Sequence, residues 1–412
     1  MFTTTSGSVL MKDRIEPVLR QSFQEEDNLF AAMMDEVPKE PTNPRGRRMS
    51  IRVQPNASYG SPTEGALMPI PGQPLDIEAI IKYLNQFKLG EFSGEIKDLP
   101  TEDAIVSFMA RNQKGDTETF NHTQNVLLFG VGTGSHGVVT ATNATTTATF
   151  DPATTDMGSR QILIGARMQF FTSGGVQRAG GSVTVSTVTA NNKSTGVVTF
   201  DAVPSDLAAT DVIVYENSYG RGTHGLPYHI DDANATWLTV NRATYPDTKG
   251  IVHDAAVSAL SAGMIDLAQL KVKKQSGVNV PINDFVLVSH PAQKYQYRQL
   301  GYALTRVINA TGNMKIDLGF PEATHNGMRW KEDLDAAPSD LWGLRFSTWA
   351  IEFVKLPGFY EFDDGKRLIQ KPGVSTYYDA YQYGIYARYD VICKDPKSNF
   401  RIKRLTYAAG TA

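Results

Sequence analysis

One stretch of about 30 residues, numbered 43–74, limits most strongly what this chain can fold into. Its sequence is NPRGRRMSIRVQPNASYGSPTEGALMPIPGQP, which is polar and interrupted by Pro and Gly. Connections of more than about 15 residues without secondary structure are uncommon in compact domains unless they serve a function. The segment therefore indicates a long loop with a task of its own.

A small basic cluster lies in this loop and consists of Arg45, Arg47, Arg48 and Arg52. Solvation or contact with acidic neighbours is the simpler interpretation, and direct binding of nucleic acid is the alternative. The whole chain has 40 Lys and Arg against 43 Asp and Glu, which gives a net charge of -3. Because dedicated nucleic-acid-binding domains are clearly basic, this balance favours the simpler interpretation.

Two helices are predicted in the first third of the chain. Apolar residues recur at helical spacing over residues 11–37, and Pro38 ends the pattern. This helix belongs either to the surface of a globular domain or to an arm that lies on a neighbouring subunit. A second helix, over residues 101–129, would span about 40 Å at about 1.5 Å per residue. Its centre is polar and contains Gly115, which is typical of a strut rather than a core element.

The composition changes abruptly at Gly130. Residues 131–150 contain no Lys, Arg, Asp or Glu, and Thr is abundant among them. Thr, Val and Gly continue to about Tyr219, with β-branched residues between Gly, Asn, Asp and Pro. This pattern indicates short antiparallel strands. We therefore predict a separate small β domain over residues 131–222.

The remaining chain mixes both kinds of secondary structure. A helix is predicted over residues 261–275, and a second one begins at Pro291, where proline is favoured at the first helical position. Predicted strands cover residues 285–289, 328–330, 341–344, 350–354, 377–393 and 400–405. The whole chain is therefore expected to be an α+β protein.

Two motifs raise the question of a chemical site. The segment GVGTGSHG, residues 130–137, looks like a phosphate-binding loop, but it follows a predicted helix and precedes a strand. A phosphate loop needs the opposite order, because the amides of a helix N-terminus bind the anion. A flexible junction is the simpler interpretation. His229 with Asp231 and Asp232 is a candidate metal site, and turn-forming acids are the simpler interpretation there.

Other signatures of chemistry are missing from the sequence. The seven histidines do not have the spacing of a zinc site, and no Gly-x-Ser-x-Gly elbow is present. Tyrosines gather near the end, where packing in a core or interface is favoured over a base-stacking platform. They are Tyr377, Tyr378, Tyr381, Tyr383, Tyr386 and Tyr389. We therefore predict no catalytic residues, no cofactor and no metal, so the chain is not expected to be an enzyme.

The ends and the single cysteine bear on the compartment. The N-terminus, MFTTTSGSVLMKDR, has no basic segment followed by an apolar run, so we expect no signal peptide. No stretch approaches the roughly 18 apolar residues of a membrane helix. Cys393 has no second cysteine to pair with inside the chain, which fits a reducing cytoplasm. We expect Cys393 to be a small buried residue in a strand.

The order of these segments resembles the coat-protein fold of tailed bacteriophages. This is the Hong Kong 97-like fold, which encapsulins and the floor of herpesvirus shells also use. Four stretches carry the resemblance. The spine helix of the family and its Gly-rich exit are similar to LPTEDAIVSFMARNQKGDTETFNHTQNVLLFGVGTG, and the start of the axial domain is similar to GLPYHIDDANATWLTVNR. A strand, turn and helix of the axial domain are similar to FVLVSHPAQKYQYRQL, and its later strand pair is similar to GMRWKEDLDAAPSDLWGL.

The resemblance implies six parts within the α+β chain. They are an N-terminal arm (1–42), an extended loop with a return strand (43–98), the spine helix of a peripheral domain (99–130), an inserted β domain (131–222), an axial domain (223–371) and C-terminal strands of the peripheral domain (372–412). The inserted β domain departs from the minimal fold, and insertions of this kind occur in the family.

The resemblance also implies a function and partners. The chain would assemble into the icosahedral or prolate shell that encloses a phage genome, located in the virion capsid and built in the host cytoplasm. Implied partners are copies of itself in hexamers and pentamers, a separate scaffolding protein, a portal, decoration proteins and non-specifically contacted DNA, with no membrane. Loop residues expected to be buried between subunits are Ile51, Val53, Leu67, Met68 and Ile70. The alternatives are an encapsulin-type cargo shell and a β-rich hydrolase.

Overall fold

The computed structural model describes residues 9, 11–12, 28–54, 56, 58–81, 83–94, 96, 101–143, 145–150, 162–193, 195–233, 235–277, 284–308, 325–362, 365–372 and 377–407. Most of the predicted first helix, residues 13–27, lies outside them. Its end is present as α3 (Leu29–Glu36), whose first turn Asn28 caps by accepting a hydrogen bond from Ala31 N. The helix ends directly before Pro38, because the residue preceding a proline is disfavoured in helical conformation.

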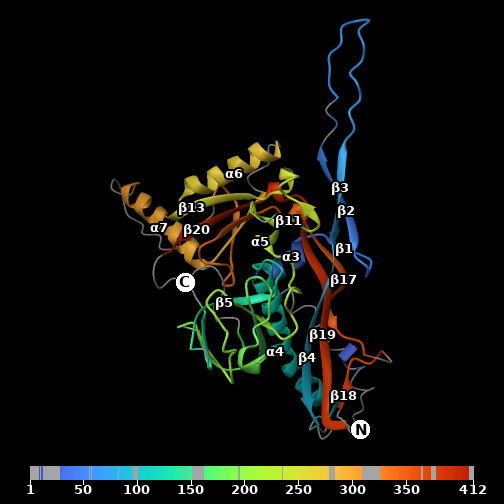
Figure 1. Ribbon diagram of the computed structural model, residues 1–412, viewed down its shortest axis with the longest axis vertical. Coiled ribbons are helices and arrows are strands. Elements are labelled where there is room, and N and C mark those ends of the chain that lie inside the picture. Colours follow the sequence, from blue (N-terminus) through green and yellow to red (C-terminus); the bar gives the residue numbers. More distant parts are fainter. Residues whose placement is uncertain are drawn as a thin grey trace.

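The main structural support of the molecule is a long sheet built around one strand of 17 residues, β19 (Tyr377–Cys393). β19 pairs antiparallel with β17 (Trp349–Phe359), β18 (Ile369–Pro372) and β4 (Leu84–Ser93), and β17 pairs in parallel with β1 (Lys39–Pro41). The sheet therefore joins the beginning and the end of the chain. Figure 1 shows β4 and β19 running side by side down the lower half of the molecule.

The predicted strut is a single helix, α4 (Glu102–Leu128), which lies along the long sheet (Figure 1). Its apolar residues join a core with α3 and the sheet. A further row of polar side chains is also buried: Gln113, Thr117, Asn121, Gln124 and Asn125. Two polar residues of α4 are hydrogen-bonded to the sheet: Tyr389 Oη donates to Gln124 Oε1 at 2.7 Å, and Tyr383 donates to Asp116. The polar centre of the predicted helix is therefore partly buried against other elements of the subunit.

A second, mixed sheet has the order β13-β20-β16-β14-β15. Its strands are β13 (Ile251–Ala259), β20 (Phe400–Thr406), β16 (Leu341–Leu344), β14 (Val286–Ser289) and β15 (Arg329–Glu332). The helix α6 (Ala262–Ser276) packs on β13 and β20, and α7 (Pro291–Ile308) follows β14 directly. These elements confirm the helices and strands that the sequence predicts in this region.

The two sheets exchange strands in a way that differs from the expected ranges. β20 lies in the mixed sheet between β13 and β16, although residues 372–412 were expected to belong together with β19. β17 lies in the long sheet, although its residues fall in the range 223–371. Strand pairing is set by hydrogen bonds between distant segments, so the order along the chain does not reveal which sheet a strand joins.

Residues that the sequence assigns to an inserted β domain form a closed barrel. Its strand order is β10-β5-β6-β9-β8-β7. The strands are β5 (Ser135–Thr142), β6 (Thr147–Phe150), β7 (Arg167–Phe171), β8 (Ser186–Asn192), β9 (Val197–Phe200) and β10 (Val212–Tyr215). Side chains alternate, so Ala148 and Phe150 face an apolar core of the barrel's own. Closure leaves no free sheet edge, which lets such short strands form a stable unit.

The two chain segments that lead into and out of the barrel meet at its base. Val131 and His224 form an antiparallel bridge, and a Cβ on Gly222 would lie 2.5 Å from Gly134 N. Gly134 also has φ of +78°, a conformation that favours glycine. The two glycine-rich junctions of the barrel therefore lie close in space.

The polar segment of residues 43–74 is only partly a loop. Its first part is β2 (Arg47–Gln54), which pairs antiparallel with β3 (Leu75–Ile81). Figure 1 shows this hairpin rising from one end of the molecule and continuing into a long extension. Met49 and Ile51 pack with Trp237 at its base, so alternating apolar residues fix this part as a strand. The described residues beyond Gln54 and before Leu75 carry neither helix nor strand.

Because the barrel has its own core and its ends meet, we predict that it can be removed. Replacing residues 133–219 with a short Gly/Ser linker should leave the rest of the subunit folded, since closing so short a gap adds little loop entropy. Circular dichroism and a cooperative thermal transition check this. In a companion variant, Phe170→Ala, the barrel should melt earlier, because removing a buried Phe side chain costs about 3–5 kcal/mol. Unfolding of the remainder in the linker variant would show that the barrel is part of the main core.

Candidate functional site

The candidate metal site at His229 is a packing arrangement. His229 is fully buried, its Nδ1 accepts a hydrogen bond from Trp237 Nε1 at 2.9 Å, and its Nε2 lies 2.9 Å from Val391 O. This pattern places the proton on Nε2, and burial holds the pKa of His229 well below its usual value. Both ring nitrogens are occupied, so the imidazole has no lone pair for a metal. Within the described part of the chain, no group of three His, Cys, Asp or Glu side chains could hold a metal ion.

The glycine segment does not form a phosphate cradle. Gly130 follows the end of α4, and the next regular element is the strand β5. Gly132 and Gly134 adopt φ of +88° and +78° where the chain turns into the barrel. The amides of this segment therefore do not sit at a helix N-terminus, which an anion site of this type requires. The segment serves as the junction that the simpler interpretation predicts.

Three of the four loop arginines contact acidic neighbours. Arg48 Nη1 lies 3.2 Å from Glu78 and Arg52 Nε lies 3.1 Å from Asp76, both across the β2–β3 hairpin. Arg47 bonds to Glu40 and Glu352 at the base of the hairpin. These contacts favour the interpretation that the cluster is neutralised within the subunit over the one that it binds nucleic acid.

The late tyrosines divide into buried and exposed members. Tyr381, Tyr383 and Tyr389 are buried in the core between α4 and the long sheet, where the ring of Tyr383 stacks on Phe92 at 4.6 Å. Tyr377, by contrast, is 70% exposed at the start of β19. Core packing is therefore confirmed for the buried three. Cys393 is also buried, as expected, and burial raises the pKa of its thiol.

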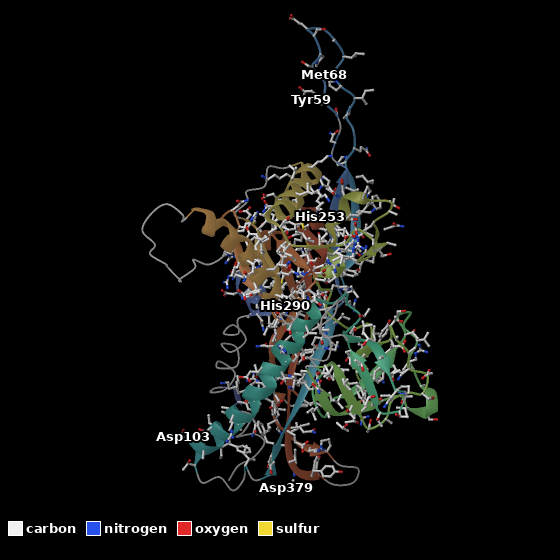
Figure 2. The ribbon with its side chains drawn as sticks, turned by 90° about the vertical axis from the view of Figure 1, so that its left-hand side faces the viewer. Tyr59, Met68, Asp103, His253, His290 and Asp379 are labelled. Carbon is white, nitrogen blue, oxygen red and sulfur yellow. The ribbon has the colours of Figure 1, made fainter. Side chains whose placement is uncertain are left out.

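The most unusual surface is the end of the hairpin extension, residues 58–74, which we name the loop tip. Its apolar side chains are almost fully solvated: Tyr59 is 92%, Leu67 96%, Met68 81% and Ile70 88% exposed. Figure 2 shows Tyr59 and Met68 at the far end of the extension, away from the rest of the molecule. An apolar group gathered at one exposed point marks an interaction surface.

Two of the loop residues expected to be buried between subunits lie at the base of the hairpin. Ile51 is half-buried against Trp237 and Ala79 of its own subunit, and Val53 is also half-buried. The base of the hairpin is therefore anchored to the body, and the most exposed of the expected contact residues are those of the loop tip.

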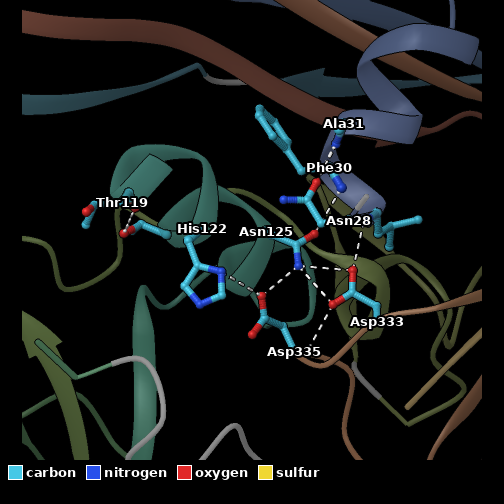
Figure 3. A network of polar contacts seen from close by, with 10 residues as sticks. Asn28, Phe30, Ala31, Thr119, His122, Asn125, Asp333 and Asp335 are labelled. Carbon is cyan, nitrogen blue, oxygen red and sulfur yellow. Dashed lines mark hydrogen bonds and ion pairs between the residues drawn. The ribbon is translucent and has the colours of Figure 1, made fainter. Parts of the chain in front are cut away.

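A second feature is a buried polar network where α3, α4 and the turn after β15 meet (Figure 3). Asp333 Oδ2 accepts from Leu29 N at 2.8 Å, and Asn125 Oδ1 accepts from Phe30 N at 2.9 Å. The side-chain amide of Asn125 donates to Asp333 at 3.0 Å and to Asp335 at 2.7 Å. Three parts of the chain that are far apart in sequence are thus joined by one amide side chain.

The electrostatics of this network are unusual for a carboxylate pair. Burial, with the nearby negative charge of Asp335, raises the pKa of Asp333 to about 6. Hydrogen bonds from Asp335 N, Leu29 N and Asn125 favour the ionised carboxylate and limit the shift. The Nδ1 atom of His122, on the exposed side of α4, lies 3.5 Å from Asp335 Oδ2. The network therefore holds a carboxyl group, that of Asp333, whose charge can change near neutral pH.

A third polar contact fixes the base of the barrel to β19. His224 Nδ1 lies 2.6 Å from Asp390 Oδ2, and His224 N donates to Asp390 Oδ1 at 3.0 Å. Burial alone would lower the pKa of His224, but the charge and the hydrogen bond of Asp390 outweigh it and raise the pKa. The ring also packs on Tyr228 at 4.2 Å. The pair connects the return strand of the barrel to the long sheet.

The sequence did not identify these networks. Asp333 and Asp335 stand in EDLDAAPSD, which has the composition of an ordinary acidic turn, and Asn125 follows Gln124 in a polar part of the predicted helix. The acidic partners of Asn125 lie more than 200 positions away, at separations of 208 and 210 residues, so no local pattern points to them.

Comparison with solved structures defines the fold. The chain is similar to a chain of the capsid asymmetric unit of cyanophage A-1(L), with a TM-score of 0.53 and 12% identity, over 91% of this chain and 93% of that chain. At this identity the similarity shows the fold, which is the Hong Kong 97-like coat-protein fold, so the predicted fold class is confirmed.

Two further similarities have lower scores. The capsid of the native GTA particle gives a TM-score of 0.46 at 10% identity, over 91% of this chain and 90% of that chain. Mycobacterium phage Bobi gives 0.44 at 7% identity, over 90% of this chain and 89% of that chain. No model of a known protein family matches the sequence, and no curated protein matches it. Among the described residues, no helix combines the length and apolar character needed to cross a membrane.

The His224–Asp390 pair predicts a pH-dependent stability. Because the pKa of His224 is raised in the folded subunit, its contribution is fully present below the usual histidine pKa and is lost as the pH rises through the raised value. The variant His224→Gln keeps a hydrogen-bond donor but cannot become charged. Its deficit in melting temperature should therefore be largest in acid and should shrink in base, in thermal unfolding measured from about pH 5 to about pH 9. A deficit independent of pH would contradict the prediction.

Proposed function

We propose that the chain is a structural subunit that assembles into the shell enclosing a phage genome. The observation that carries the proposal is the loop tip, whose apolar side chains project far from the body of a subunit with a capsid coat-protein fold. Such a surface has a use only when another molecule covers it. The proposed role is structural rather than catalytic, and the proposed location is the virion capsid.

The geometry suggests how the loop tip would work. The β2–β3 hairpin is held to the body by the packing of Met49 and Ile51 against Trp237, so it holds the loop tip at a fixed place. Burying one Leu, Ile or Met side chain stabilises by about 1.5–3 kcal/mol. Each contact contributes modestly to the stability of the shell. Every subunit in a closed lattice contacts one neighbour with its own loop tip and is contacted by the loop tip of another, so the contributions accumulate.

The six parts expected from the sequence remain a proposal with two changes. We propose that the peripheral domain comprises α4 and the long sheet, including β17, and that the axial domain comprises α6, α7 and the mixed sheet, including β20. We further propose hexamers and pentamers as the assembled units, with a separate scaffolding protein, a portal and decoration proteins as partners. We also propose that contact with packaged DNA is non-specific, because the loop arginines Arg48 and Arg52 are paired with acids of their own subunit.

The loop tip provides the first test. The triple variant Leu67→Ser, Met68→Ser, Ile70→Ser should leave the stability of the isolated subunit within about 0.5 kcal/mol, because the side chains are exposed there. Assembly should be lost or greatly slowed, because the buried apolar area is removed at every contact. Thermal unfolding and light scattering measure the two effects.

A matched control distinguishes the tip from any exposed apolar residue. Val176 is 67% exposed on the barrel, and Val176→Ser should assemble like the wild type. Wild-type assembly by the triple variant would argue against the proposed contact. A large loss of subunit stability in that variant would instead show that the tip packs on its own subunit.

The second test is the assembly itself. The purified protein, alone or with a scaffolding partner, should form rings of five or six, sheets or closed shells, seen by negative-stain electron microscopy. The interface must bury more than about 1,000 Å² between neighbours to be stable. A monodisperse monomer under every condition, with a scaffold supplied, would refute the proposed function.

A further inference from the structure

The first turn of α3 is held in an unusual way. The first amides of a helix have no partner within the helix and must be bound by other groups. Here the side chain of Asn28 accepts from Ala31 N, whereas Leu29 N is bound by Asp333 and Phe30 N by Asn125. The start of this helix is therefore fastened to α4 and to the turn that follows β15 of the mixed sheet by side chains of those segments.

The fastening depends on two carboxylates that share one donor. Asp333 and Asp335 are buried, at 4% and 2% exposed, and both accept from the Nδ2 atom of Asn125. Asp335 N also donates to Asp333 Oδ1 at 2.9 Å, which keeps the two side chains together. Two like charges this close in a buried place repel each other, so one proton shared by the pair relieves the repulsion.

Other charged groups face the pair from each element around it. From α4 come His122, 3.5 Å from Asp335, and Glu118, which lines the same cavity. Beside the pair in the chain is Glu332, whose Oε1 lies 2.7 Å from Lys294 Nζ and 4.0 Å from Arg298 of α7. The cavity of about 710 Å³ is open to the surface, so water and protons reach the joint.

We propose that Asp333, Asp335 and His122 form a proton-controlled joint that holds the first turn of α3 to α4 and to the mixed sheet, most firmly when the carboxylate pair carries a proton. With the proton bound, one carboxyl group of the pair is neutral, so the hydrogen bonds to α3 persist without repulsion between the two side chains. As the pH rises, the proton leaves and both carboxylates are negative.

The sign of the pH dependence of the joint follows from the thermodynamic linkage between proton binding and the closed state. The pKa of Asp333 is raised in the closed joint, so the closed state binds the proton more tightly than an open, solvated state does. The stabilisation is therefore fully present below the ordinary aspartate pKa and is lost as the pH rises through about 6. Since α3 leads directly into β1, which precedes the β2–β3 hairpin, loosening the joint would act on the segment that leads to the loop tip. This consequence in a shell rests on the proposed function, whereas the joint is a property of the subunit.

The test uses the full-length, unassembled subunit, so that its outcome does not depend on assembly. Hydrogen–deuterium exchange of the peptide that contains residues 28–36 is measured from about pH 4.5 to about pH 7.5, with labelling times adjusted for the intrinsic rate. The exchange of the first turn of α3 should rise at least about tenfold over this range, because one pKa unit corresponds to a tenfold change. In Asp335→Asn, which removes one charge and keeps the shape, the rise should be clearly smaller than in the wild type, because the charge of Asp335 is removed while the burial of Asp333 remains.

Two further variants complete the test. Glu118→Gln lines the same cavity but does not contact the pair through any described hydrogen bond, so it should keep the wild-type rise. His122→Gln changes a half-exposed residue and should give a shallower rise, which keeps the proposal testable if Asp335→Asn does not fold. A flat wild-type profile, or an unchanged rise in Asp335→Asn or in His122→Gln, would overturn the proposal.

Discussion

The pairing of β19 with its neighbours is the constraint on which the rest of the structure depends. This one strand joins β4 from the first quarter of the chain to β17 and β18 from the last. Its side chains also reach α4, through Tyr389 and Gln124, and the base of the barrel, through Asp390 and His224. If β19 were displaced, α4 and the base of the barrel would lose a common support, because they contact the adjacent residues Tyr389 and Asp390 of this strand.

The parts attached to this frame differ in how independent they are. The barrel closes on itself and has a core of its own, and the chain enters and leaves it at two glycine-rich junctions. The β2–β3 hairpin cannot stand alone, since an isolated two-stranded hairpin is marginally stable in water. It is held at its base by Trp237 and Ala79, and its far end has no support from the described residues of its own subunit. The far end of the hairpin is therefore suited to contact a neighbouring subunit.

Buried polar residues make the joints between these parts, whereas apolar residues fill the cores. Asn125 joins three segments, and Asp390 joins two. Such groups add little net stability, because each hydrogen bond replaces one to water, but a wrong arrangement leaves a buried polar atom without a partner and is costly. They therefore fix how the elements are oriented. The same joints contain the groups whose charge depends on pH, so orientation and protonation are coupled in this subunit.

The sequence by itself determined the elements with strong periodicity. The helix at residues 101–129, the strand at residues 377–393 and the limits of the Thr-rich β segment were all evident from the order of residue types, because local patterns decide local structure. Resemblance in the order of segments also gave the fold class. Only the tertiary structure decided which sheet β17 and β20 join, that Ile51 packs inward while Leu67 stays exposed, and that Asn125 meets Asp333. These outcomes depend on contacts between residues hundreds of positions apart, and one sequence contains no signal of which distant partners meet.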